Sequence, residues 1–170
     1  MLKDFDISEF KKNKPPSDNS ITTKNEIKEL KKIPIREKFV KEMDNGEANF
    51  KKIVGNDPLI DKIISKADPV IMKLKKYFNR PRPAVLAKKL GIEFEDIKLK
   101  SMKTPAYPSG HATTATLLSL VLSDKYPKKE SKLKKLARDI IHSRSVAHTH
   151  YPSDNIAGEK LGKQMYNHIK

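Results

Sequence analysis

Apolar residues recur every three or four positions over most of this chain, and that spacing constrains its fold more than any other feature. One such series contains Leu59, Ile60, Ile63 and Ile64, and another contains Ile71, Leu74 and Phe78. The same spacing predicts helices over about 110–124, 129–148 and 153–169. The sequence has no alternation of apolar and polar residues long enough to predict a β-strand, and no internal repeat. The sequence therefore predicts an all-α fold, a helical bundle.

Prolines indicate where these helices begin and end. Asn56-Asp57-Pro58 is typical of a helix start, because proline suits the first turn. Pro69 is expected to begin or kink the next helix. Pro81 and Pro83 end that helix and keep the backbone extended. Residues 84–107 are then expected to form a short helix followed by a long loop.

The length and the distribution of polar residues favour one domain preceded by a polar N-terminal segment. The chain has 170 residues, enough for a single modest core. Residues 1–24 are polar and contain Pro15-Pro16, so we expect an N-terminal arm or a meandering cap, followed by a helical domain over 25–170. The first residues lack the apolar run of a signal peptide, and the longest apolar stretch, 115–122, is too short to span a bilayer. We expect a soluble, cytoplasmic protein.

Charge points to anionic partners. The net charge of +15 favours phosphates, lipid headgroups or nucleic acid, although most of the lysines are expected to form a solvated surface. Only five of the 36 basic residues are arginines, whose planar guanidinium groups suit phosphate oxygens better than lysine does. The chain has no cysteine, which excludes disulfides and thiolate metal sites.

Three of the five arginines lie in three short segments that share a chemistry. The segments are 75–83 (KKYFNRPRP), 108–111 (PSGH) and 143–154 (SRSVAHTHYPSD). Together they contain a lysine, arginines, a glycine at a predicted helix start, histidines and an aspartate. These side chains suit the binding of a phosphate group and attack on its phosphorus.

The segment Pro108 to His111 precedes the apolar run of a predicted helix. Ser109 and Gly110 place free backbone N–H groups at the helix start, where the helix dipole also favours an anion. An ordinary N-cap made by Ser109 is the alternative. His111 adds a group that can donate a proton near neutral pH.

Arg144 continues the apolar face of the preceding helix, four residues after Ile140. A charge at an inward position is costly unless it is paired. The alternatives are an arginine whose end reaches solvent and one that pairs with a core carboxylate.

His150 and Asp154 flank Tyr151-Pro152-Ser153. An aspartate near a histidine can accept one ring N–H, set the tautomer and leave the other nitrogen free to attack. His148 and His150 are also spaced to form a metal pair, but no third ligand stands out, and we expect no metal site.

In this order, K-x6-R-P, P-S-G-H and S-R-x5-H-x3-D resemble the phosphatase signature of the type 2 phosphatidic acid phosphatase superfamily. That superfamily includes the bacterial class A nonspecific acid phosphatases and, more distantly, the vanadium haloperoxidases. The resemblance covers about residues 60–166, whereas residues 1–55 carry no such signal. It implies a single-domain helical bundle of the acid phosphatase/vanadium haloperoxidase type.

The resemblance also implies a role for each matching residue. His150 would attack phosphorus to form a phosphohistidine, Asp154 would orient its ring, and His111 would protonate the leaving oxygen. The phosphate oxygens would be held by Lys75, Arg82, Ser109, Gly110 and Arg144. No cofactor is implied, although phosphate or vanadate can occupy such a site. Pairing with Asp154 is expected to favour protonated His150 and to make activity depend on pH.

The first motif fits in two registers. Lys73 with Arg80 matches K-x6-R-P as well as Lys75 with Arg82 does. Family members often read K-x-x-F-x-R-x-R-P, and Phe78 places this chain in the second register. We therefore choose Lys75 and Arg82, and expect Lys73 and Arg80 either behind the site or facing solvent.

The expected function is a metal-independent phosphomonoesterase acting on small soluble organic phosphates. The first alternative is a lipid phosphate phosphatase that contacts an anionic membrane surface. A vanadium-dependent haloperoxidase and a non-catalytic anion or nucleic-acid binder are further alternatives. The binder is supported by charge alone, so no obligate nucleic-acid partner is expected. A homodimer is an open alternative to a monomer.

Overall fold

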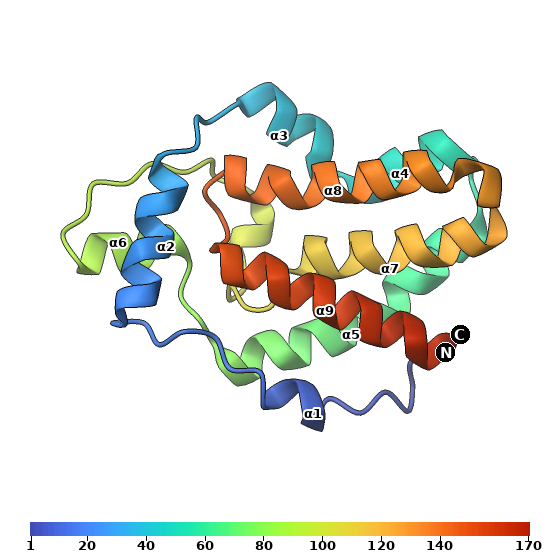
Figure 1. Cartoon of the computed structure of the whole chain (residues 1–170), viewed down its shortest axis with the longest axis horizontal. Coiled ribbons are helices and arrows are strands. Elements are labelled where there is room, and N and C mark those ends of the chain that lie inside the picture. Colours follow the sequence, from blue (N-terminus) through green and yellow to red (C-terminus); the bar gives the residue numbers. More distant parts are fainter.

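The computed structural model describes residues 1–170 and consists of helices joined by turns and loops (Figure 1), which confirms the all-α prediction. The α-helices are α1 (Ser8–Lys11), α2 (Ile21–Lys31), α3 (Glu37–Asp44), α4 (Gly46–Val54), α5 (Pro58–Phe78), α6 (Pro83–Lys89), α7 (Gly110–Lys125), α8 (Glu130–Val146) and α9 (Pro152–Ile169). Two short 3₁₀ helices, η1 (Lys100–Lys103) and η2 (Pro127–Lys129), lie before α7 and α8.

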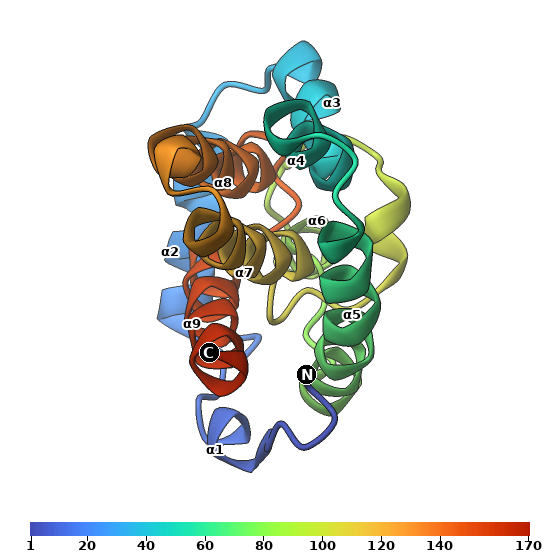
Figure 2. The same ribbon diagram turned by 90° about the vertical axis from the view of Figure 1, so that its right-hand side faces the viewer.

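Helix α7 lies at the centre of the bundle and packs against α4, α5, α8 and α9 (Figure 2). Its buried residues include Ala112, Leu117 and Ser119, which do not share one helix face. A helix buried on several faces is the core of the domain rather than part of its surface. The main hydrophobic core accordingly joins α7 to residues of α5, α8 and α9.

Helices α7 and α9 approach closely because α9 presents glycine to α7. A Cβ atom at Gly158 would lie 2.6 Å from the carbonyl oxygen of Ser109, and one at Gly162 would lie 2.7 Å from that of Thr113. No side chain fits at such distances without backbone movement. The start of α9 is therefore held directly against the Pro108–His111 segment.

The predicted helix boundaries are close to the observed ones. Asp57 is the N-cap of α5 and Pro58 occupies its first turn, as expected. The expectation that Pro69 begins a new helix is wrong, since α5 continues through it from Pro58 to Phe78. Pro69 removes one backbone hydrogen bond, but Ala67 and Ile71 on either side are buried in the core. Burial of this apolar face outweighs the lost bond.

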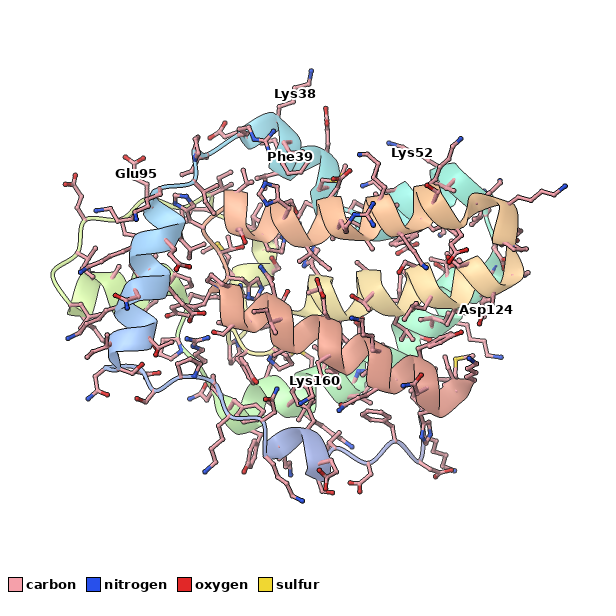
Figure 3. All side chains as sticks on the ribbon, in the orientation of Figure 1. Lys38, Phe39, Lys52, Glu95, Asp124 and Lys160 are labelled. Atoms are coloured by element: carbon pink, nitrogen blue, oxygen red, sulfur yellow. The ribbon has the colours of Figure 1, made fainter.

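Residues 1–24 lie against the bundle. Leu2 and Phe10 are buried in the main core, and α2 begins at Ile21 with Ser20 as its N-cap. These apolar side chains explain how a mostly polar segment packs. In Figure 3, Lys38, Lys52 and Lys160 project outward from α3, α4 and α9, as expected of solvated lysines.

The ends of four helices meet at one end of the molecule. The C-terminal ends of α5 and α8 lie there with the N-terminal ends of α7 and α9, beside α2 and α6 (Figure 1). All three sequence segments that suit phosphate chemistry fall at these helix ends. No helix in the structure has both the length and the apolar character needed to cross a membrane.

Candidate active site

His150 has a single ring tautomer that its contacts identify. Its Nδ1 lies 2.9 Å from Oδ2 of Asp154, and its Nε2 lies 3.0 Å from Nη1 of Arg82. A guanidinium can only donate, so Nε2 must accept and carries no proton. The proton is therefore on Nδ1, where it is donated to the carboxylate. His150 is a neutral ring whose Nε2 holds a lone pair.

The electrostatics of His150 contradict the expectation that Asp154 keeps it protonated. Burial lowers the pKa of His150 well below its ordinary value, and the cations of Arg82 and Lys75 lower it further. The ring is only 2% exposed. Sequence reasoning considered the one carboxylate and omitted both desolvation and the neighbouring cations, which act in the opposite direction.

Asp154 is held from three directions. Its Oδ2 also accepts the backbone N–H of Tyr151, and its Oδ1 accepts Nη1 of Arg80 at 2.8 Å. Burial raises the pKa of Asp154, and Arg80 opposes that effect. The carboxylate therefore cannot turn away from the His150 ring without losing several bonds.

Arg80 is buried behind the site, which excludes the solvent-facing alternative. It is 2% exposed, its Nη2 lies 3.2 Å from Oε2 of Glu26, and its guanidinium stacks 3.7 Å from the ring centroid of Tyr151. Glu26 also accepts the backbone N–H and the hydroxyl of Ser153. Helix α2 is thereby tied to the start of α9.

Arg82 and Lys75 lie on the other side of His150. Arg82 donates to the carbonyl oxygens of Ser101, Thr104 and Thr149, and Lys75 donates to the Thr104 hydroxyl at 2.8 Å. Burial lowers the pKa of Lys75 to about 8 and that of Arg82 to about 10. Both side chains carry a positive charge at neutral pH. Lys73 is exposed, so the geometry supports the register with Lys75 and Arg82.

Ser109 is the N-cap of α7, as the alternative interpretation held, and Gly110 is its first residue. The Ser109 hydroxyl accepts the N–H of Ala112, which leaves its own proton free for another acceptor. A Cβ atom at Gly110 would lie 3.9 Å from Nζ of Lys75. The cap and the anion-site interpretations are thus compatible, because the helix start lies beside the lysine.

His111 and Arg144 share one carboxylate, Asp44. Nη1 of Arg144 lies 3.1 Å from Oδ1 of Asp44, and Nε2 of His111 donates to the Asp44 carbonyl oxygen at 2.9 Å. The same Nε2 lies 3.5 Å from Oδ1 of Asp44, and this interaction of His111 with the carboxyl group lowers the pKa of Asp44. Arg144 is fully buried and its Nη2 has no hydrogen-bond partner. The arginine predicted to face inward does so and pairs with a carboxylate.

A pocket of about 590 Å³ opens beside these groups. Lys75, Thr104, Gly110 and His111 are among its lining residues. His150 is buried next to them, bonded to Arg82. The pocket therefore leads from the surface to the cationic side of the site.

The alternative metal pair does not form. His148 bonds the carbonyl oxygens of Glu95 and Ile33 through its two ring nitrogens, each at 2.8 Å. The nitrogens of His150 are engaged by Asp154 and Arg82. The two rings have separate partners and do not converge on a common point.

Sequence reasoning missed three residues that hold the site: Glu26, Asp44 and Thr104. Glu26 and Asp44 come from the N-terminal region, which carries no recognisable motif. The only available signal was indirect, because a buried arginine requires a carboxylate partner somewhere in the chain. Which of the 21 acidic residues provides it is decided by the fold.

Comparison with known proteins finds similar sequences among bacterial acid phosphatases. Over 88 residues, which are 52% of this chain and 35% of the relative, the chain is 38% identical to a non-specific acid phosphatase of Salmonella typhimurium. A non-specific acid phosphatase of Salmonella typhi matches equally. The chain thus covers only 35% of the length of these relatives.

A transmembrane PAP2 type phosphatidylglycerolphosphate phosphatase from Bacillus subtilis overlaps in structure. The TM-score is 0.48 and the identity 17%, over 86% of this chain and 72% of that one. The sequence profile of the PAP2 superfamily matches residues 62–163, which include all three motifs and more than half of the chain. The chain belongs to the PAP2 superfamily.

Proposed function

We propose that this chain is a phosphomonoesterase that works through a phosphohistidine at His150. One observation carries the proposal: His150 is a neutral ring with its proton on Nδ1, bonded to Asp154, and a lone pair on Nε2. That is the form a nitrogen nucleophile requires. The non-specific acid phosphatase activity in the names of the two Salmonella relatives supports the same class of reaction.

In the first step the Nε2 lone pair forms a bond to phosphorus while the bond from phosphorus to the leaving oxygen breaks. The ring becomes cationic as the bond forms, and Asp154 stabilises it through the Nδ1–H. Water then attacks the phosphorus, the nitrogen–phosphorus bond breaks, and phosphate leaves. Because Asp154 is fixed by Arg80 and Tyr151, the ring keeps one orientation through both steps.

The negative charge of the phosphoryl group would be balanced by Lys75, Arg82 and Arg144. The free Nη2 of Arg144 and the free Ser109 hydroxyl proton add donors that no protein acceptor uses. The Gly110 N–H at the start of α7 adds another. Phosphoryl transfer depends mainly on such positioning and charge stabilisation. We propose that these side chains supply it without a metal ion.

We propose that His111 supplies the proton that the leaving oxygen needs. Its Nε2 carries a proton, because the Asp44 carbonyl oxygen that it contacts can only accept. Its side chain is 23% exposed and lines the pocket, so a substrate oxygen can reach it. Transfer of a proton from the doubly protonated ring to the leaving oxygen leaves a neutral imidazole and avoids the release of an alkoxide.

The proposed substrates are small organic phosphate monoesters in solution. A pocket of about 590 Å³ beside the phosphate-binding groups suits a leaving group of that size. The cytoplasmic location, the homodimer and contact with an anionic membrane stay predictions that no observation here addresses.

Phosphate release from p-nitrophenyl phosphate in EDTA tests the proposal. The His150→Ala variant is expected to lose turnover by about a thousandfold or more, because no other side chain can replace the nucleophile. His142 is an exposed histidine on α8, and His142→Ala provides a matched control that should keep its rate. Rapid quenching with labelled substrate should trap label that is stable to alkali and labile to acid. Turnover retained by His150→Ala would refute the mechanism.

A further inference from the structure

The pocket combines an apolar wall with carboxylates. Eighteen residues line it, and seven of them are hydrophobic. Of these, Phe50 and Leu118 are fully or nearly fully buried, whereas Ile64 and Met72 on α5 are only partly buried. Such a surface receives the carbon chain or ring of a ligand more readily than a hydrated, fully polar group.

The charge of the pocket is opposite to that of the whole chain. The sequence has 36 basic and 21 acidic residues, but the pocket lining has three carboxylates, Asp44, Glu47 and Asp68, and a single lysine, Lys75. That lysine belongs to the phosphate-binding end. The rest of the pocket is therefore a locally acidic surface on a strongly basic protein.

The three carboxylates differ in what they already bind. Asp44 pairs with Arg144, and Glu47 pairs with Lys51 at 2.6 Å. Asp68 is exposed and forms no hydrogen bond or salt bridge. Partial burial raises the pKa of its carboxyl, and the nearby His111 and Lys75 oppose that effect. Asp68 is the carboxylate that a ligand can bind without first displacing a protein cation.

Asp68 and Lys75 lie on one face of α5. The pocket-lining residues of this helix are Ile64, Asp68, Ile71, Met72 and Lys75, at the three- and four-residue steps of a single helix stripe. Asp68 and Lys75 are seven positions apart, so their Cα atoms differ by about 10.5 Å along the helix axis. An apolar surface thus joins an anion-binding end to a cation-binding end.

We propose that this pocket selects phosphate monoesters whose leaving group has an apolar carbon chain and a terminal ammonium, with Asp68 as the residue that binds the ammonium. The proposal rests on the phosphatase function proposed above and names the substrate class of that same site. A chain of about six carbons spans the distance between the two ends. Leaving groups that carry further phosphates or a carboxylate meet repulsion from Asp68 instead.

Three esters with the same six-carbon chain test the proposal: hexyl phosphate, 6-aminohexyl phosphate and the phosphate ester of 6-hydroxyhexanoate. The measured quantity is kcat/KM for released phosphate. In the natural protein the amino ester should exceed the neutral ester by about threefold to tenfold, and the carboxylate ester should fall below it by a similar factor. Added salt should narrow both differences, because the charges are exposed.

Two substitutions at one position provide the decisive comparison. Asp68→Asn should bring the ratio of amino to neutral ester close to one, and Asp68→Lys should make the carboxylate ester the better substrate. Glu29→Gln removes an exposed carboxylate on α2, outside the pocket, and should leave the ratio as in the natural protein. Each variant is first checked for helix content by circular dichroism.

The outcomes separate this inference from the function on which it rests. If hexyl phosphate and p-nitrophenyl phosphate are hydrolysed but the amino ester shows no advantage, the inference fails and the phosphatase stands. If Asp68→Lys keeps the natural order of the three esters, the inference also fails. If no ester releases phosphate, the proposed function itself is wrong.

Discussion

The two sides of His150 are built differently. Behind the ring, Asp154 and Arg80 are buried and contact each other at 2.8 Å. In front of it, Asp44 is 41% exposed and Asp68 is exposed as well. The same types of charged side chain therefore form a closed network on one side and an open surface on the other.

The difference follows from the dielectric environment. Charges behind the ring interact strongly, since little water screens them, and an unpaired member would be costly. The exposed carboxylates in front, Asp44 and Asp68, are screened by solvent and can exchange protein partners for ligand groups at small cost. The buried side suits the orientation of a nucleophile, and the open side suits the selection of what enters.

Removing the cation from the buried network behind His150 should have the largest effect, a loss of folding stability. Arg80→Met leaves Asp154 and Glu26 without their cation, and the free energy of unfolding should fall by about 3–5 kcal/mol. Urea denaturation measures this loss. Arg138→Met removes an exposed arginine on α8 and should change stability by less than about 0.5 kcal/mol. Equal losses in the two variants would show that the buried network is no stronger than a surface charge.

The pH dependence of kcat/KM tests the ionisation of His150 and of Lys75, which lies on the pocket side of the ring. Because the pKa of Lys75 is lowered to about 8, kcat/KM should fall above pH 8 as the ammonium loses its proton. The pKa of His150 is lowered too, so the acid-side decline should lie below pH 6.5. Initial rates with p-nitrophenyl phosphate across this range measure both limits.

Lys75→Arg is the control for this profile. Arginine keeps its charge at high pH, so the decline above pH 8 should disappear even if the maximal rate is lower. Unfolding does not explain that decline. Between about 8 and 10.5 the unfolded chain binds the Lys75 proton and the folded chain does not, so the contribution of Lys75 to stability rises with pH. A decline that persists in Lys75→Arg would assign it to another group.

Neutralising an exposed carboxylate on the pocket side of His150 should have the smallest effect, a change in the binding of inorganic phosphate. Asp44→Asn removes a negative charge beside Arg144 and His111. It keeps a side-chain oxygen that can accept from Arg144, and the backbone carbonyl that accepts from His111 is unchanged. Inorganic phosphate should inhibit this variant at about a threefold lower concentration, because an anion no longer competes with a carboxylate. Steady-state inhibition measures the change. Weaker inhibition would mean that Asp44 positions Arg144 for phosphate and does not compete with it.

Sequence patterns predicted the helices better than the contacts between them. The spacing that ends at Ile140 placed Arg144 inward, and the structure shows it fully buried. The prediction for Arg80 left a solvent-facing position open, because Arg80 follows the end of α5, directly before Pro81, and belongs to no helix stripe. Periodicity carries no information there. Its burial depends on Glu26, which lies 54 residues away.

The sequence by itself determined the helices, the residues at their ends and the family, since each of these depends on local spacing and on short motifs. The tertiary structure decided the charge state of His150, the partners of Arg80 and Arg144, and the acidic character of the pocket. Those properties depend on burial and on charges distant in the chain. Both are set only when α2, α3 and α5 pack around the ends of α7, α8 and α9.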